Sequence, residues 1–209
     1  MPGPASTPRR RLPPDQRREL IEIAAAEVFA ERGYRSASVE EIAKRSGISV
    51  PVLYDHFASK RDLHRHLLEK HFAELRALWA ERLGVLGGKQ GQRIRDAIDA
   101  WFAYVEGHPY ASRMLFADTS GDPEIGAMHR EVFDKSRSAL LPVLAQEVHL
   151  DSNKDEVVVE MLWEGVRGVL QGLARWWSEN PTVPRQQVVD AAVTTLWTGL
   201  GHIGKRHSS

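Results

Sequence analysis

The sequence predicts an all-α protein of about nine helices, with a short N-terminal three-helix unit and a larger C-terminal helical domain. Apolar residues recur at three- and four-residue spacing along most of the chain, as in amphipathic helices, and no segment shows the alternation of a strand. Glycine and proline clusters such as Gly87-Gly88 and Asn180-Pro181 separate the helical segments. Together these observations favour a helical protein punctuated by short turns.

Composition narrows the class of protein. A chain of 209 residues is long enough for one or two domains with a substantial core. No apolar run approaches the ~20 residues that span a bilayer, and residues 1–14 lack the apolar stretch of a signal peptide. The absence of cysteine excludes disulfides, thiolate zinc sites and a cysteine nucleophile. We therefore expect a cytoplasmic protein with no membrane association.

The charge is unevenly distributed although the formal net charge is zero. Residues 1–70 hold 13 Lys and Arg against 10 Asp and Glu, whereas residues 71–209 hold 15 against 18. The modest basic excess therefore lies in the N-terminal part of the chain.

The first predicted helix follows a proline-rich arm. Residues 1–13 have no apolar periodicity and are predicted to be disordered. Helical patterning begins near Asp15, and Gly33 ends the helix in the usual place for a left-handed cap. One apolar stripe runs along it: Leu20, Ile21, Ala24, Ala25, Val28 and Phe29.

Two short helices are predicted next. Ser38 and Glu41 form a capping box that starts a helix ending near Arg45, and Gly47 turns the chain.

The following helix is predicted to be capped by Ser49, with Pro51 in its first turn. Ser59 and Asp62 form another capping box, which opens the fourth helix. The remaining chain is predicted to form helices over 59–83, 92–107, 109–118, 123–148, 153–179 and 184–203.

The third helix has an unusual outward face. Leu53 and Phe57 are four residues apart and should join the core. Val50, Pro51, Tyr54 and Asp55 are left on the opposite face, where an ordinary surface helix would carry lysine and glutamate. A helix, a glycine turn and a second helix of this size are typical of a helix-turn-helix that places a helix in DNA. The alternative is that these three helices simply pack over the end of a helical bundle and do not contact DNA.

The residue types around this helix suggest how it would contact a duplex. Donors to phosphate oxygens are Ser49, Tyr54, His56 and Lys60. Electrostatic attraction would come from Arg17, Arg18, Lys44 and Arg45. Residues 49–57 contain no Arg, Lys, Asn or Gln for bidentate base contacts, so Val50 and Pro51 are expected to touch thymine methyls, with shape readout supplying the rest.

The segment over about residues 16–65 resembles the N-terminal domain of tetracycline-repressor-type (TetR family) regulators. The matching residues are Phe29, Gly33-Tyr34, Ser38-Val39, Ile42-Ala43, Gly47-Ile48-Ser49, Leu53-Tyr54, His56-Phe57, Ser59-Lys60 and Leu63. The resemblance implies that the residues at the DNA include Ser38, Ser49, Val50, Pro51, Tyr54, His56 and Lys60. It also implies a DNA-binding domain over 14–58 and a ligand-binding and dimerisation domain over 59–209.

Two C-terminal stripes favour a homodimer. Gly165, Gly168 and Gly172 share one face with Trp176, and glycine in a helix suggests that another helix presses close. The last helix offers apolar residues that include Val189, Val193, Leu196 and Trp197. Two such helices from each chain would form a four-helix interface, which suits a near-palindromic operator. The alternative is that both stripes are buried within one monomer.

Large apolar side chains in the middle helices are candidates for a small-molecule pocket. They are Trp101, Tyr104, Tyr110, Met114, Met128 and Trp163. Arg167 is a candidate anchor for an acidic ligand. The alternative for the apolar side chains is that they fill an ordinary core. The alternative for Arg167 is an exposed salt bridge.

The resemblance therefore implies a ligand-responsive transcriptional regulator that is released from its operator when a small molecule binds. Repression is the favoured effect on transcription, and activation is the alternative. The helix from Ser59 to about Leu83 would transmit the change. No cofactor is expected.

An enzyme is disfavoured, because the spacing of His64, His66 and His71 suits no zinc pair and no catalytic motif occurs. A helical protein-interaction module without sequence-specific DNA binding is the other alternative. Arg9-Arg10-Arg11 is read equally as a minor-groove arm or a solvated tail.

Overall fold

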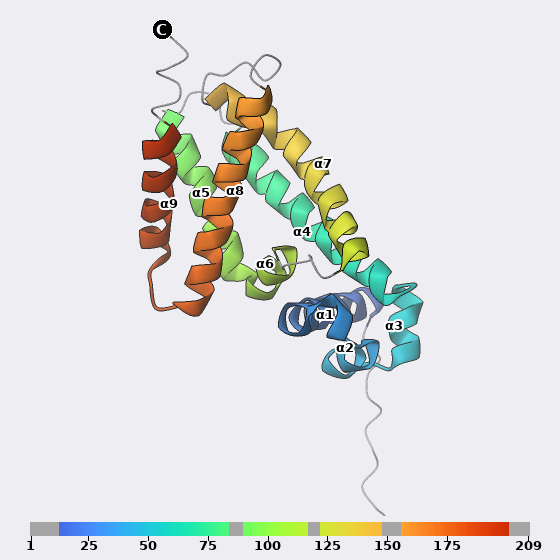
Figure 1. Ribbon diagram of the computed structural model, residues 1–209. Helices are drawn as coiled ribbons and strands as arrows, with labels where there is room; N and C mark the ends of the chain where they lie inside the picture. Colours follow the sequence, from blue (N-terminus) through green and yellow to red (C-terminus); the bar gives the residue numbers. More distant parts are fainter. Residues whose placement is uncertain (1–12, 84–89, 117–121, 148–155, 201–209) are drawn as a thin grey trace, which may run out of the picture. The chain divides into compact units, whose positions relative to one another are not determined.

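A computed structural model of the protein describes residues 13–83, 90–116, 122–147 and 156–200. Nine α-helices and no strand occur in these ranges, which confirms the all-α prediction. None of these helices has the length and apolarity required to cross a bilayer. The helices are α1 (Pro14–Ser36), α2 (Val39–Arg45), α3 (Val50–His56), α4 (Lys60–Leu83), α5 (Gln90–Gly107), α6 (Pro109–Leu115), α7 (Pro123–Glu147), α8 (Glu156–Glu179) and α9 (Arg185–Leu200) (Figure 1).

The chain divides into two compact units, Met1–His64 and Arg65–Ser209, and α4 crosses the division. The functional domain limits expected from the sequence, 1–13, 14–58 and 59–209, stay a prediction. Apart from Pro13, the proposed arm lies outside the described residues, and with it Arg9-Arg10-Arg11.

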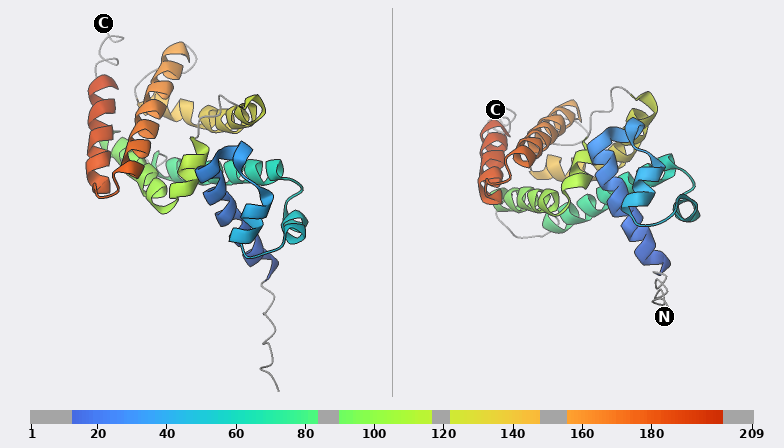
Figure 2. Two further views of the ribbon diagram at one scale, coloured as in Figure 1. Left: turned by 60° about the horizontal axis from the view of Figure 1, so that its bottom comes forward. Right: turned by 90° about the horizontal axis from the view of Figure 1, so that it is seen from below.

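The core of the first unit is built from one face of each of its helices. In α1 the predicted stripe supplies Ile21 and Phe29, which are 0 % and 2 % exposed. Ile42 of α2 and Leu53 of α3 are fully buried, so three helices converge on one apolar centre (Figure 2). Each side chain of this size contributes ~1.5–3 kcal/mol when it is removed from water.

Two glycines make the turns that the sequence predicts. Gly33 and Gly47 have φ angles of 71° and 70°, in the region that side chains with a Cβ avoid. Gly33 lies within the residues assigned to α1 and breaks its helical geometry before the chain reaches α2. The amide of Ile48 donates to the carbonyl of Ala43 at 3.0 Å and closes the second turn.

The predicted caps are borne out at two helices and wrong at a third. The hydroxyls of Ser38 and Ser59 each accept from a backbone amide, of Glu41 and Asp62, at 3.0 Å. Ser49 occupies the N-cap position of α3, but its side chain makes no cap bond. A cap of this kind bonds the second or third amide of the helix, and Pro51 has no N–H to offer at the second position.

Lys60 ties the start of α4 to the end of α1. Its ammonium donates to the carbonyls of Tyr34 and Ala37 at 2.9 and 3.0 Å, and to that of Arg35 at 3.5 Å. The same nitrogen lies 4.5 Å from the centre of the Tyr34 ring. These carbonyls lie where the helical geometry of α1 ends, so a cation is well placed to satisfy them.

In the second unit α5, α8 and α9 lie close together, and α7 packs against α8 (Figure 1). Arg185 at the start of α9 pairs with Asp99 and Glu106 of α5 at 3.0 and 2.6 Å. The Trp177 indole near the end of α8 donates to the Val183 carbonyl at 2.8 Å and fixes the turn between α8 and α9. The C-terminal helices are therefore joined by polar contacts as well as by apolar packing.

Replacing Lys60 by methionine should destabilise the protein by ~1–3 kcal/mol, because three carbonyls lose a charged donor. The shift is measured as a lower midpoint of urea unfolding of the full chain, followed by circular dichroism. Lys44→Met is the matched control, since the Lys44 side chain is exposed and makes no hydrogen bond to a described residue. Equal midpoints for the two variants would show that the Lys60 contacts contribute nothing.

Candidate functional site

The outer face of α3 is turned to solvent. Pro51, Tyr54 and Asp55 are exposed, and the Tyr54 side chain keeps 48 % of its surface accessible. Leu53 on the opposite face has no accessible surface. Val50 is half-buried at the first turn. The helix therefore presents a proline, a tyrosine and part of a valine to whatever approaches it.

The polar candidates around α3 have different surroundings. Ser49 is exposed and its hydroxyl is not used as a cap, so it remains able to donate to a phosphate. Lys44 is exposed at the end of α2. Ser38 is half-buried, and although its oxygen accepts the cap bond, its hydroxyl proton is still a donor. Lys60 differs from them, because its ammonium already serves backbone carbonyls.

Arg18 fixes the far end of α3. Its guanidinium lies 4.5 Å from the centre of the Phe57 ring and donates to the His56 carbonyl at 3.5 Å. Glu22, one turn along α1, pairs with Arg18 at 3.2 Å. The sequence suggested only electrostatic attraction to DNA for Arg18, whereas the structure gives it a part in positioning the helix.

Arg45 is also held within the first unit. It pairs with Glu31 and Glu41 at 2.7 and 2.6 Å. The carboxylates that hold it offset the charge that the sequence assigned to DNA attraction. Lys44, beside it in the chain, lacks such partners among the described residues and is the better phosphate candidate.

The pocket candidates of the second unit are mostly buried. Five of them have 8 % or less of their surface exposed: Trp101, Tyr104, Met114, Met128 and Trp163. Tyr110 is half-buried, and the Arg113 guanidinium lies 5.1 Å from the centre of its ring. Arg167 pairs with Glu164 and lies 5.5 Å from the centre of the Phe133 ring. Because that carboxylate balances its charge, Arg167 is a weaker anchor for an acid than the sequence suggested.

A polar network that the sequence did not predict joins α4 to α5. His71 Nδ1 lies 2.5 Å from the Tyr104 hydroxyl, which donates to Glu74 at 2.9 Å. His108 stacks on Tyr104 with ring centres 4.3 Å apart. Burial lowers the pKa of His71, although Glu74 opposes the shift, and burial together with Glu74 raises the pKa of Tyr104. The sequence signal for this network is a histidine with a glutamate three residues later among the apolar residues of α4.

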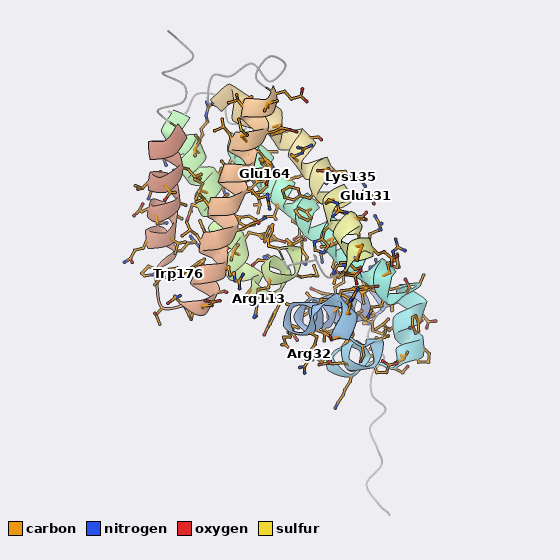
Figure 3. The ribbon with its side chains drawn as sticks, in the orientation of Figure 1. Arg32, Arg113, Glu131, Lys135, Glu164 and Trp176 are labelled. Atoms are coloured by element: carbon orange, nitrogen blue, oxygen red, sulfur yellow. The ribbon has the colours of Figure 1, made fainter. Side chains whose placement is uncertain are left out.

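The proposed dimer residues divide into an exposed group and a buried group. Gly165, Gly168, Gly172 and Trp176 of α8 are all exposed, and Trp176 is labelled in Figure 3. A Cβ built on any of the three glycines would meet no described atom within 4 Å. Two further apolar side chains extend this face, Val157 at 68 % and Met161 at 61 % exposed. We call these six residues the α8 stripe.

The α9 candidates do not share this exposure. Val189 and Leu196 are 0 % and 8 % exposed, because they pack inside the protomer where α9 lies against α5 and α8. Their side chains are therefore interior, contrary to the free surface that the sequence suggested. Val193 is half-buried, and the side chain of Trp197 lies outside the described part of the chain.

A short outward-facing helix after a glycine turn is typical of a helix-turn-helix DNA-binding domain, the class of domain found in many transcriptional regulators. Residues 23–67 match the model of the tetR family of bacterial regulatory proteins. The chain is 32 % identical over 204 residues to the HTH-type transcriptional activator FasR of Mycolicibacterium smegmatis, covering 96 % of this chain and 91 % of that protein. This chain belongs to the tetR family, which consists of DNA-binding regulators and not of enzymes.

Other relatives agree on the fold. The HTH-type transcriptional repressor KstR2 of Mycobacterium tuberculosis is 27 % identical over 188 residues, covering 88 % of this chain and 92 % of that protein. Its solved structure superposes with a TM-score of 0.66, covering 88 % of this chain and 94 % of that one. A TetR-like regulator from Rhodococcus sp. RHA1 reaches a TM-score of 0.74 at 22 % identity, covering 91 % and 99 % of the two chains.

Acidification should destabilise the protein through two histidines of the second unit, the buried His71 and the half-buried His129. Burial lowers the pKa of both His71 and His129, so the folded state binds fewer protons than the unfolded chain. The contribution of these two histidines to the free energy of unfolding is therefore complete above ~6.5, the pKa of a histidine in the unfolded chain. It decreases as the pH falls below that value. The melting temperature, measured by calorimetry between about pH 7.5 and pH 5.5, should fall less in a His71→Gln/His129→Gln double variant than in the wild type.

His56→Gln is the control for this experiment, since it changes a histidine of α3 and keeps both His71 and His129. It should retain the full wild-type dependence on pH. Parallel curves for the wild type and the double variant would contradict the assignment.

Proposed function

We propose that this protein is a homodimeric repressor that binds a near-palindromic operator through α3 and leaves it when a small apolar molecule binds the second unit. The observation that carries the proposal is the exposed face of α3, where Pro51 and Tyr54 stand free of the core. We propose that the protein acts in the cytoplasm, where its operator would lie.

Base reading is assigned to the first turn of α3. Because residues 49–57 offer no bidentate side chain, contacts to guanine and adenine edges of the usual kind are absent. Val50 and Pro51 can instead touch thymine methyls, which are the apolar feature of the major groove. Phosphate contacts would come from Ser49, Tyr54 and Lys44, with Ser38 and His56 at the margins, while Lys60 acts through the position of α4.

Dimerisation is assigned to the α8 stripe. Glycine in a helix interior costs ~1 kcal/mol relative to alanine, and the three glycines on this exposed face pack against no described residue of the protomer. A second helix laid against that face would use the space that the missing side chains leave. Val157, Met161 and Trp176 would then be removed from water by the partner.

Effector binding is assigned to the aromatic residues of the second unit. α4 contributes the buried Phe72 and the half-buried Trp79 to them, and it also carries Lys60 and Leu63 of the first unit. A molecule that favours one arrangement of α4 over another would change operator affinity by its difference in affinity for the two states. The relative from Mycobacterium tuberculosis is described as a ketosteroid transcriptional regulator, which suits an apolar effector here.

Activation is the second candidate for the effect on transcription. The relative with 32 % identity is an activator, whereas the one with 27 % identity is a repressor. A reporter gene placed behind the recovered operator separates the two, because deletion of this protein raises the reporter under repression and lowers it under activation. A titration with salt distinguishes a DNA-binding regulator from a helical protein-interaction module. The affinity of a regulator for its operator should fall steeply as the ionic strength rises.

Tyr54→Ala should weaken operator binding about tenfold or more, because the variant loses both a ring and a phosphate donor at the exposed face. Val50→Ala should relax the preference for thymine at the contacted positions. Operators are recovered from a random duplex pool, and affinities are measured by fluorescence anisotropy at one fixed salt concentration. Tyr54→Phe is the matched control, because it loses only the hydroxyl. If Tyr54→Ala bound the operator with wild-type affinity, the assignment of α3 to the DNA interface would be wrong.

Gly168→Glu/Gly172→Glu should convert the dimer to a monomer, because the two carboxylates occupy the space reserved for a partner helix. Analytical ultracentrifugation measures the change. Ser178→Glu, also exposed on α8, is the control and should stay dimeric. A dimer that survives the glycine substitutions would place the interface elsewhere.

A further inference from the structure

Two buried indoles of the second unit have donors without acceptors. Trp101 of α5 and Trp163 of α8 are 2 % and 8 % exposed, and neither Nε1 meets an acceptor in the described part of the protein. Trp177, which is buried to a similar degree, does donate, to the Val183 carbonyl at 2.8 Å. A buried N–H without a partner is unfavourable, so these two donors require an explanation.

Both indoles belong to one string of rings. Trp101 lies 5.1 Å from Phe116, and Phe116 lies 6.4 Å from Phe72, between ring centres. Phe133 continues the string at 5.8 Å from Phe72 and 5.9 Å from Trp163. We call these rings, with Trp79 stacked on Trp101 at 5.7 Å, the aromatic layer. The two donors therefore border a single apolar region.

The aromatic layer also holds α4 to its neighbours. Within the second unit the backbones of α5, α6, α7, α8 and α9 approach one another closely. The backbone of α4 comes close to the other described helices at isolated points at most. Phe72 and Trp79 reach from α4 to rings of α5 and α7 and to Phe116 instead. Rings change rotamer more easily than backbones change spacing, so this layer is where a molecule would enter with least disturbance.

The charges around the layer disfavour an anion. Arg167 is the cation that lies against one of its rings among the described residues, and Glu164 pairs with it. Arg137, on the same helix as Phe133, pairs with Glu160 at 2.7 Å and with Asp134 at 3.6 Å. A carboxylate placed among the rings would lose its hydration, and these two arginines already have carboxylate partners.

We propose that the effector is an uncharged, mainly apolar molecule with at least one carbonyl or ester oxygen, and that Trp101 and Trp163 supply the N–H donors that recognise it. The inference rests on the proposed function, because it names the class of molecule that the second unit senses. The rings hold the apolar body, and the oxygen satisfies an indole N–H that has no acceptor among the described residues.

The test compares two matched series of probes by isothermal titration calorimetry with the full-length protein. One series is 2-acetylnaphthalene, 2-ethylnaphthalene and 2-naphthoate, and the other is methyl dodecanoate, dodecane and dodecanoate. Within a series that binds, the neutral oxygen-bearing probe should bind about tenfold more tightly than the hydrocarbon and the carboxylate.

Trp101→Phe and Trp163→Phe remove the donor and keep an aromatic ring. At least one of them should reduce the advantage of the oxygen-bearing probe about fivefold, while affinity for the hydrocarbon stays within about twofold. Trp177→Phe is the matched control, since its N–H is already bonded, and it should leave the preference unchanged. The hydrocarbon reports any loss of packing that the smaller ring causes.

The outcomes separate the inference from the function beneath it. Tightest binding by the carboxylates, or an unchanged preference in both Trp101→Phe and Trp163→Phe, would overturn the inference and leave effector binding in place. If no probe bound, the aromatic layer would not be the effector site, and the inference would be wrong. Operator binding is tested separately by fluorescence anisotropy.

Discussion

The position of α3 depends on the burial of Leu53 and Phe57. A helix of seven residues has too few hydrogen bonds to be stable in water by itself. These two side chains, 0 % and 2 % exposed, fix which face of α3 turns inward. Tyr54 and Pro51 are exposed as a direct result. Arg18 then holds the last turn of the helix through the Phe57 ring and the His56 carbonyl.

Local features of the fold were predictable from the sequence, because caps, glycine turns and apolar stripes depend on neighbouring residues. Gly33 and Gly47 have the positive φ angles that their positions indicated. The error at Ser49 was also local, since the proline two residues later removes one of the amides that its hydroxyl would bond.

Features that depend on distant partners were not predictable. Lys60 bonds carbonyls more than twenty residues earlier, and His71 meets Tyr104, which lies 33 residues away in the chain. The stripe of α9 was identified correctly as apolar, but periodicity does not tell what covers a stripe. Val189 and Leu196 are covered within the protomer. Of the pocket candidates, Trp101 and Trp163 were recognised in the sequence as large apolar side chains, whereas their burial and their unsatisfied donors required coordinates.

The glycines of α8 have a consequence for how much folded protein a cell contains. A helix of 24 residues that carries three exposed glycines is weakened as a free surface helix. Under the proposed assembly, the partner chain supplies the packing that these positions lack. Folding and self-association are then linked by mass action, so stability rises with the number of copies made. At low expression more chains would be monomeric and open to proteolysis. The amount of protein made would then determine how fully the operator is occupied.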